Sequence, residues 1–282
     1  MIKNGVNLDE IKPLIDYALK EDVGDGDITT NLLIPFDLKT KAIMVAKSSG
    51  IIAGLDVAKL VFYTISQDII WQTFVKDGDS IVKGDIIVEI TGSYRALLTG
   101  ERLALNFLQR MSGIATTTST YVNVLSGYKT KILDTRKTVP GLRLLDKYAV
   151  KMGGGTNHRF GLYDMILIKD NHIKVAGGIS KAVAQIRENI PANIQIEVET
   201  TTLAEVKEAL EANVDIIMLD NMTTDAMAES VKIIGGRAKI EASGNMTIER
   251  LQIVAATGVD FISIGALTHS VAAFDISMNI ES

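Results

Sequence analysis

The chain has 282 residues, 47% of them apolar, which is enough to fill one large hydrophobic core or two modest ones. Its net charge of −5 argues against nucleic acid or an anionic membrane as the main partner. The sequence contains no cysteine, which excludes disulfides and thiolate metal sites and suits a reducing cytoplasm. The N-terminus lacks the apolar core of a signal peptide, and the longest uncharged run, residues 111–128, is too rich in Thr, Ser and Asn to span a membrane. We therefore expect a cytoplasmic globular protein.

The first hundred residues predict a mixture of helices and short antiparallel strands. Apolar residues at helical spacing follow Asn7, and Asn7 with Glu10 resembles a capping box, so we expect a helix from residue 8. Residues 40–54 predict strand, turn and strand, and residues 71–92 predict short strands separated by Asp-Gly and Lys-Gly-Asp turns. The second stretch is similar to the hairpins of biotinyl and lipoyl carrier domains. It has no lysine in the tight turn that those carriers modify, so we interpret it as structural.

The pattern changes after a long helix that we expect from Leu97, with a bend near Gly113. Short apolar strands then alternate with amphipathic helices that begin at Thr or Asp and end at Gly. We expect the strands to end near Leu133, Ile168, Val198, Leu219, Ile240 and Ile264. Such alternation predicts parallel strands with right-handed crossovers. It fits a partial or complete β/α barrel, and it also fits an open doubly wound sheet.

Polar residues follow each predicted strand, at the edge where both architectures place their active sites. They are Asp134, Arg136, Lys137, Lys169, Asp170, Asn171, Glu199, Asp220, Asn221, Ser243, Gly244, Asn245 and Gly265. Glu197 and Glu199 alternate along one strand and point to the same face. An ionised carboxylate in a buried strand is costly unless it is paired or metal-bound, which favours a functional role for Glu199. The alternatives are a helix cap for Asp220 and a surface position for Lys169.

The charges of this predicted site are mostly positive, although the whole chain is negative. Its cationic side chains are Arg136, Lys137, His158, Arg159 and Lys169, and its acids are Glu199 and Asp220. Such a concentration of positive charge suggests a small, strongly anionic substrate. The two acids suit Mg²⁺, which prefers a couple of carboxylates together with substrate phosphates.

The segment "GGGTNHRFGLYDMILIKDNH", residues 153–172, admits three interpretations: a metal site, a phosphate cradle or a pocket for an anionic substrate. His158 and His172 have neither helical pair spacing nor a third histidine nearby, so a histidine metal site is weakly supported. The three glycines lack the Gly-Lys-Ser/Thr ending of a P-loop and fit a helix stop better. The pocket for an anion, with Arg159 and Lys169, is the interpretation that remains.

Two other short segments suit phosphate better, because small residues directly after strands expose backbone N–H groups. They are "SGN", residues 243–245, and "SIGA", residues 263–266.

Several long motifs closely resemble the quinolinate phosphoribosyltransferase family, and the resemblance covers nearly the whole chain. They are "ALKEDVGDGDITT", "GERLALNFLQRMSGIAT", "ILDTRKTVPGLRLLDKYAVKMGGGTNHRFGLYDMILIKDNHI", "IMLDNM" and "IEASGNMTIERLQIVAATGVDFISIGALTHS". The series "DTRKT…NHR…IKDNH" is the most specific part. Val139 is a conservative departure, since the resemblance leads us to expect Thr before the Pro-Gly pair.

The resemblance implies an N-terminal α/β sandwich domain, residues 1–112, followed by an incomplete, open-faced β/α barrel, residues 113–270. The tail, residues 271–282, would return to the first domain. It also implies a homodimer, with a hexamer as the larger alternative, in which the partner's N-terminal domain covers each barrel mouth. Arg102 of the partner would then complete the active site, whereas by itself Arg102 fits a surface ion pair on a long helix.

The reaction implied by the resemblance joins quinolinate to 5-phosphoribosyl 1-pyrophosphate and releases pyrophosphate and CO₂, giving nicotinate mononucleotide for NAD biosynthesis. Mg²⁺ would arrive with the pyrophosphate substrate, and Glu199 and Asp220 would hold it. The implied catalytic residues are Lys137, Lys169, Glu199 and Asp220. The implied substrate-binding residues are Arg102, Thr135, Arg136, Lys137, His158, Arg159, Lys169, Ser243, Gly244, Asn245, Ile264, Gly265 and Ala266.

Three other hypotheses compete with this one. A Schiff-base aldolase would use Lys169 as its nucleophile, but it would not need the surplus of arginines. A paralogue of the same family, associated with molybdenum transport or preferring nicotinate, would share the motifs; nicotinate has one carboxylate fewer than this pocket could hold. A carrier module built on residues 77–90 would lack its attachment lysine.

Overall fold

The computed structural model describes residues 6–191 and 193–281, whose contacts divide into two units. The first unit contains the residues up to Ser119, Val139–Gly154 and the residues from Leu267 onward. The second unit contains Thr120–Thr138 and Gly155–Ala266. Within the described ranges, we find no helix long and apolar enough to cross a membrane.

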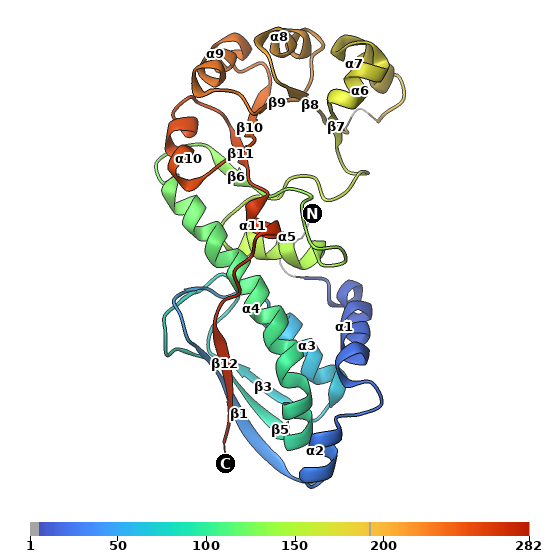
Figure 1. Cartoon of the computed structure of the whole chain (residues 1–282), viewed down its shortest axis with the longest axis vertical. Helices are drawn as coiled ribbons and strands as arrows, with labels where there is room; N and C mark the ends of the chain where they lie inside the picture. Colours follow the sequence, from blue (N-terminus) through green and yellow to red (C-terminus); the bar gives the residue numbers. More distant parts are fainter. Residues whose placement is uncertain (1–5, 192, 282) are drawn as a thin grey trace. The chain divides into compact units, whose positions relative to one another are not determined.

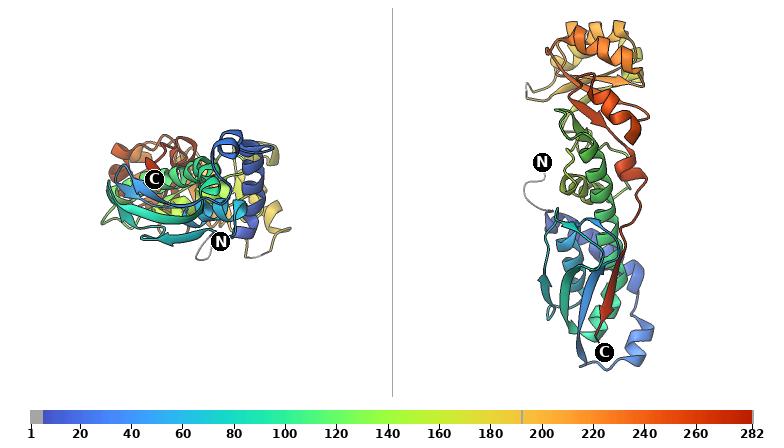
Figure 2. Two further views of the ribbon diagram at one scale, coloured as in Figure 1. Left: turned by 90° about the horizontal axis from the view of Figure 1, so that it is seen from below. Right: turned by 90° about the vertical axis from the view of Figure 1, so that its left-hand side faces the viewer.

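The first unit is built on an antiparallel sheet whose strand order is β12-β1-β5-β3. These strands are β12 (Ile276–Ile280), β1 (Lys39–Ala46), β5 (Ile86–Ser93) and β3 (Ile70–Thr73), and a small sheet pairs β2 (Gly50–Ile51) with β4 (Ser80–Ile81). The strand, turn and strand predicted over residues 40–54 exist, but they belong to different sheets. Figure 2 shows β12, in red, alongside β1, in blue, so the C-terminal strand lies next to an N-terminal one.

The helices of the first unit supply most of its apolar core. They are α1 (Leu8–Val23), α2 (Ile28–Leu33), α3 (Leu55–Ile65), α5 (Arg143–Met152) and most of α4 (Tyr94–Val124). Asn7 begins α1 as predicted, because its side chain accepts a hydrogen bond from the N–H of Asp9 at 3.1 Å. Phe62 on α3 is fully buried and contacts the ring of Trp71 on β3, with ring centroids 5.9 Å apart. Helix and sheet therefore share one core in this unit.

Two glycines of the first unit allow backbone segments to approach closely. Helix α4 continues without interruption through Gly113. A Cβ atom at Gly113 would overlap the carbonyl oxygen of Ala272, and one at Gly153 would overlap that of Ala115. Gly153 ends α5, as predicted for the glycine run. At both positions the absence of a side chain is needed for packing.

The second unit is built on a six-stranded sheet of order β6-β11-β10-β9-β8-β7, and every strand pair in it is parallel. The strands are β6 (Lys131–Leu133), β7 (Ile166–Ile168), β8 (Ile196–Thr200), β9 (Ile216–Asp220), β10 (Lys239–Ser243) and β11 (Phe261–Ser263). Five helices connect them: α6 (Asp170–Ala176), α7 (Ile179–Arg187), α8 (Leu203–Glu211), α9 (Thr224–Ile234) and α10 (Ile248–Ala255). The short α11 (Ala266–His269) follows β11.

This sheet is curved, and Figure 1 shows α7, α8, α9 and α10 along its outer side. A doubly wound sheet would carry helices on both faces, so the arrangement is that of a β/α barrel. Strands β6 and β7 are its two edges and do not pair with each other among the described strands. The loop before β7 makes an isolated bridge from Thr156 to Leu133 on β6. The predicted incomplete, open-faced barrel is thereby confirmed, following an N-terminal unit of mixed helices and antiparallel strands.

Candidate active site

The strands of the barrel place several polar side chains on one face of the sheet. Glu199 on β8 pairs laterally with Met218 on β9, and Met218 pairs with Glu241 on β10. Paired residues of a parallel sheet point to the same face, and so do residues two apart along a strand. Asp220 therefore shares the face of Glu199, at the carboxyl end of the adjacent strand. Thr223 caps α9 by accepting the N–H of Ala226, so Asp220 is not the cap of that helix.

Lys169 and Glu199 form an ion pair at the carboxyl ends of β7 and β8, with 2.6 Å between Nζ and Oε2. The side chain of Lys169 is 48% exposed and that of Glu199 is 16% exposed, so solvent and small molecules reach the pair. Lys169 precedes α6, where its backbone N–H donates to Nδ1 of His172 at 3.0 Å. His172 thus serves as a helix-capping residue in the described structure.

Arg136 and Arg159 bring two positive charges close together. Arg159 lies in the loop before β7, where its guanidinium donates to the carbonyl of Met165 at 3.1 Å. Burial lowers the pKa of Arg159, and the neighbouring charge of Arg136 lowers it further. The Nε atom of Arg136 is buried and makes no hydrogen bond. A buried donor without an acceptor, beside a second guanidinium, is the environment that a bound carboxylate or phosphate would satisfy.

The loops after β6 and after β10 adopt specific backbone conformations that the sequence predicts only in part. The N–H of Lys137 donates to the hydroxyl of Thr135 at 3.0 Å, which forms a tight turn next to Arg136. Gly244 has a φ of +91°, and a Cβ there would overlap the side chain of Asn221. Asn245 also has a positive φ, +48°. Consecutive residues with such angles expose backbone N–H groups, which supports the predicted phosphate-binding role of this loop.

The predicted residues after β11 and on α4 lie in different surroundings. The N–H of Ile264 donates to the carbonyl of Leu133 at 3.0 Å and continues the strand pairing, and its side chain is buried. Gly265 and Ala266 follow it and lead into α11. Arg102 belongs to the first unit, where it is exposed on α4.

His158 does not join the exposed cations. Its Nε2 atom lies 3.0 Å from Oε2 of Glu197 and 3.4 Å from Oε2 of Glu241, and both carboxylates are completely buried. Burial raises the pKa of Glu197 to about 7, and the nearby Glu241 adds to the shift. Burial alone would lower the pKa of His158, but its hydrogen bonds with the two glutamates outweigh it and raise that pKa to about 10.

The two shifts therefore have different leading causes: burial for Glu197, and the two neighbouring glutamates for His158. The family resemblance predicts His158 among the substrate-binding residues, and the sequence pattern gives Glu197 and Glu241 no role. The available signal was an acid in the middle of each apolar strand, in "IQIEVE" and "KIEAS".

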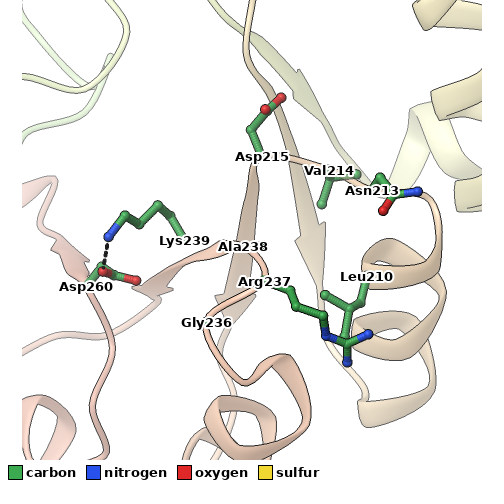
Figure 3. A pocket seen from close by; sticks show the side chains of 9 residues that line it. All are labelled: Leu210, Asn213, Val214, Asp215, Gly236, Arg237, Ala238, Lys239 and Asp260. Atoms are coloured by element: carbon green, nitrogen blue, oxygen red, sulfur yellow. Dashed lines mark hydrogen bonds and ion pairs between the residues drawn. The ribbon is translucent and has the colours of Figure 1, made fainter.

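A cleft of about 570 Å³ lies at the opposite, amino ends of the strands (Figure 3). Its charged groups already have partners: Lys239 pairs with Asp260 at 2.7 Å, and Arg237 donates to the carbonyl of Ile233 at 2.9 Å. Asp215 accepts the N–H of Ile196 at 2.7 Å. These contacts are made by segments that lead into the strands, whereas active sites of barrels lie at the carboxyl ends of the strands. The cleft is therefore not the candidate site.

The fold is that of a β/α-barrel protein, and positively charged side chains gather near the carboxyl ends of its strands. Residues 27–112 match the family described as quinolinate phosphoribosyl transferase, N-terminal domain, and residues 114–279 match its C-terminal domain. The chain belongs to the quinolinate phosphoribosyl transferase family.

Individual relatives agree with this assignment. The chain is 45% identical to a probable nicotinate-nucleotide pyrophosphorylase [carboxylating] of Bacillus subtilis, over 96% of this chain and 93% of the relative. It is 44% identical to quinolinate phosphoribosyltransferase [decarboxylating] 1b of Nicotiana tabacum, over 97% of this chain and 83% of the relative. A solved structure of the nicotinate-nucleotide pyrophosphorylase from Francisella tularensis superposes with a TM-score of 0.95 at 42% identity, covering 99% of this chain and 98% of that one.

Proposed function

We propose that this protein transfers a phosphoribosyl group from 5-phosphoribosyl 1-pyrophosphate to quinolinate, with loss of CO₂, and so forms nicotinate mononucleotide. The observation that carries the proposal is the approach of Arg136 to Arg159 near the carboxyl ends of the barrel strands, with a buried Nε of Arg136 lacking an acceptor. Quinolinate is a dicarboxylate, and each guanidinium can bind one carboxylate in a bidentate manner. Thr135, Lys137 and Lys169 line the same end of the barrel and supply further donors.

The second substrate would be held by the remaining strand-end groups. Ser243, Gly244 and Asn245, together with the segment 264–266, would bind the 5′-phosphate through backbone donors. Glu199 and Asp220 offer oxygen ligands on one face of adjacent strands, which suits the Mg²⁺ that accompanies the pyrophosphate. When bound, Mg²⁺ neutralises the charge of the departing pyrophosphate.

The chemistry then follows from the charges. As pyrophosphate leaves, C1 of the ribose becomes cationic, and carboxylates such as Glu199 stabilise it until the pyridine nitrogen attacks. The ribosylated nitrogen is positively charged and withdraws electrons from the adjacent C2. The C2–carboxylate bond breaks, CO₂ leaves, and the electron pair that stays on C2 takes a proton from water or from a lysine. Excluding bulk water favours this step.

The Schiff-base alternative is less compatible with the geometry of Lys169. The Nζ atom of Lys169 lies 2.6 Å from a carboxylate oxygen of Glu199, so in this geometry it is engaged in an ion pair and is not free to attack a carbonyl. The ion pair therefore favours a role of Lys169 in binding anions.

The direct test is an assay with quinolinate labelled in its C2 carboxyl group, 5-phosphoribosyl 1-pyrophosphate and Mg²⁺. We expect labelled CO₂ and nicotinate mononucleotide in equal amounts, and neither product when Mg²⁺ is chelated or when nicotinate replaces quinolinate. Lys137→Ala should lose most of this turnover. Folded protein that releases no CO₂ from quinolinate would refute the proposal and favour a paralogue with another anionic substrate.

We further propose that the enzyme is a homodimer, able to assemble into a hexamer, and that Arg102 of one protomer serves the active site of the other. Its exposed position on α4 makes it available to a second chain. Mixing Arg102→Ala with Arg136→Ala, each inactive alone, should restore about a quarter of wild-type activity, because half of a random mixture is heterodimer and each heterodimer has one intact site. No recovery after subunits have exchanged would show that Arg102 does not act across the dimer.

A further inference from the structure

Asn221 joins the ends of two neighbouring strands in the second unit. It follows Asp220, the last residue of β9, and its backbone N–H donates to the carbonyl of Ser243, the last residue of β10, at 3.0 Å. Asp220 and Ser243 are lateral partners in the sheet. Asn221 has a φ of +54°, in the left-handed region that asparagine tolerates better than most residues. The backbone therefore leaves the strand direction at Asn221 while it remains bonded to β10.

The side-chain amide of Asn221 contacts groups from both strands. Its Nδ2 atom donates to Oδ2 of Asp220 at 2.8 Å, and its Oδ1 atom lies 3.4 Å from Nδ2 of Asn245. A Cβ atom at Gly244 would overlap Oδ1 of Asn221, so this glycine lets the loop after β10 approach the amide. Because a carboxylate only accepts hydrogen bonds, the NH₂ group must face Asp220 and the amide oxygen must face the loop.

The loop after β10 is also held from its other side. Nη1 of Arg250 on α10 donates to the carbonyl of Asn245 at 3.1 Å. Gly244 and Asn245 keep their positive φ angles, +91° and +48°, between these two contacts. Arg250 thus relates the loop to the following helix, and Asn221 relates it to β9.

The two groups that Asn221 joins have separate tasks in the proposed function. The loop at Gly244 binds the 5′-phosphate, and Asp220 holds the Mg²⁺ that accompanies the pyrophosphate. 5-Phosphoribosyl 1-pyrophosphate carries these two anionic groups on one ribose ring, so the ligand itself limits the distance between its two binding sites. Such a ligand binds tightly only if the two sites are held at a matching distance before it arrives.

We propose that Asn221 is a positioning residue for 5-phosphoribosyl 1-pyrophosphate: its amide holds the carboxylate of Asp220 in place relative to the phosphate-binding loop at Gly244. Asn221 acts through these two groups and not through contact with the reacting atoms. The inference rests on the proposed function for the identity of the ligand. It predicts that Asn221 matters for binding of the phosphoribosyl substrate and little for quinolinate, which the arginines bind.

A role limited to the backbone is the alternative, because asparagine is also common where a positive φ is needed without any ligand. Asn213 is such a residue in the same unit. Its φ is +56°, it follows α8 on the way to the amino end of β9, and its Nδ2 donates to the carbonyl of Glu211 at 3.3 Å. The two asparagines therefore have matching backbones at opposite ends of the strands, and Asn213 provides the control.

The first test replaces each asparagine by glycine, which tolerates a positive φ without strain. Isothermal titration calorimetry would measure binding of 5-phosphoribosyl 1-pyrophosphate with Mg²⁺, in the absence of quinolinate. We expect Asn221→Gly to raise this Kd about 10-fold and the KM for quinolinate less than about 3-fold. Asn213→Gly should leave both within about 2-fold of wild type. Circular dichroism would confirm that both variants are folded, and an unchanged Kd in folded Asn221→Gly would overturn the proposal.

The second test is Asn221→Asp, which keeps the shape, the tolerance for a positive φ and an acceptor for Asn245. It replaces the N–H donor that faces Asp220 by a second negative charge, and the two carboxylates should repel each other. We expect the Kd for 5-phosphoribosyl 1-pyrophosphate to rise at least as much as in Asn221→Gly. A role limited to the backbone predicts wild-type binding in the aspartate variant, and that result would also overturn the proposal.

These measurements separate the inference from the proposed function, because binding is measured without quinolinate. If the wild-type protein binds 5-phosphoribosyl 1-pyrophosphate but releases no CO₂ from quinolinate, the proposed function fails and the comparison of Kd values still decides the role of Asn221. Wild-type protein that does not bind 5-phosphoribosyl 1-pyrophosphate would overturn both.

Discussion

Replacing Arg136 by alanine should reduce kcat/KM for quinolinate by about 100- to 1,000-fold, which corresponds to about 3–4 kcal/mol of lost transition-state stabilisation. The physical reason is the buried Nε of Arg136, which makes no hydrogen bond within the described structure and is available to a substrate carboxylate. Charge-assisted bidentate contacts of this kind are among the strongest hydrogen bonds that proteins form. The measurement is steady-state kinetics with quinolinate as the varied substrate.

Two further variants make the Arg136 result specific. Arg136→Lys keeps the charge but loses the planar fork, so it should recover only part of the activity. Arg187→Ala is the matched control: Arg187 pairs with Asp215 at 3.2 Å near the amino ends of the strands, and both side chains are more than a third exposed. Surface pairs of this kind contribute little, so kinetics should be unchanged. Equal losses in Arg136→Ala and Arg187→Ala would contradict the assignment of the site.

Replacing Glu199 by glutamine should lower kcat by about 100- to 1,000-fold and change the KM for quinolinate much less. The amide preserves shape and can still accept a hydrogen bond from Lys169, but it has no charge with which to stabilise a cationic C1 or to bind Mg²⁺. The Lys169–Glu199 pair is partly exposed, so its loss should hardly affect stability. Thermal denaturation and single-turnover kinetics would separate the two effects.

The control for Glu199 is Glu211→Gln, because Glu211 is exposed at the end of α8, in the same unit. We expect wild-type kinetics from it, since Glu211 ends the helix that leads into the amino end of β9, whereas the proposed site lies at the carboxyl ends of the strands. If Glu199→Gln raised the KM for quinolinate and left kcat intact, Glu199 would be a binding residue and the proposed stabilisation of C1 would be wrong.

The strand-end positions of the candidate site were predictable because they depend on local patterns. Strands of alternating or continuous apolar residues end where polar residues begin, and Thr202 and Thr223 mark the helix starts by capping geometry that depends on a few neighbouring residues. These patterns predict that Lys169, Glu199 and Asp220 lie at one edge of a parallel sheet. The approach of Nζ to Oε2 in the Lys169–Glu199 pair is consistent with that assignment.

The role of glycines and the pairing of strands were less predictable. Gly113 lies inside a helix and accommodates Ala272, a residue far along the chain, which no pattern near Gly113 predicts. Likewise, β1 and β2 follow each other closely, yet β1 pairs with β12 and β5 while β2 pairs with β4. Contacts between distant segments leave no periodic signature in either partner.

The sequence by itself determined the alternation of strands and helices, the positive character of the strand-end cluster and the family motifs, because each is carried by neighbouring residues. Only the tertiary structure decided that the sheet is an open barrel and that His158 lies with Glu197 and Glu241 and not among the exposed cations. These three residues come from a loop and two separate strands, and they meet only because parallel strands bring their inward faces together. Burial then strengthens the electrostatic interaction of His158 with the two glutamates, which its sequence position does not reveal.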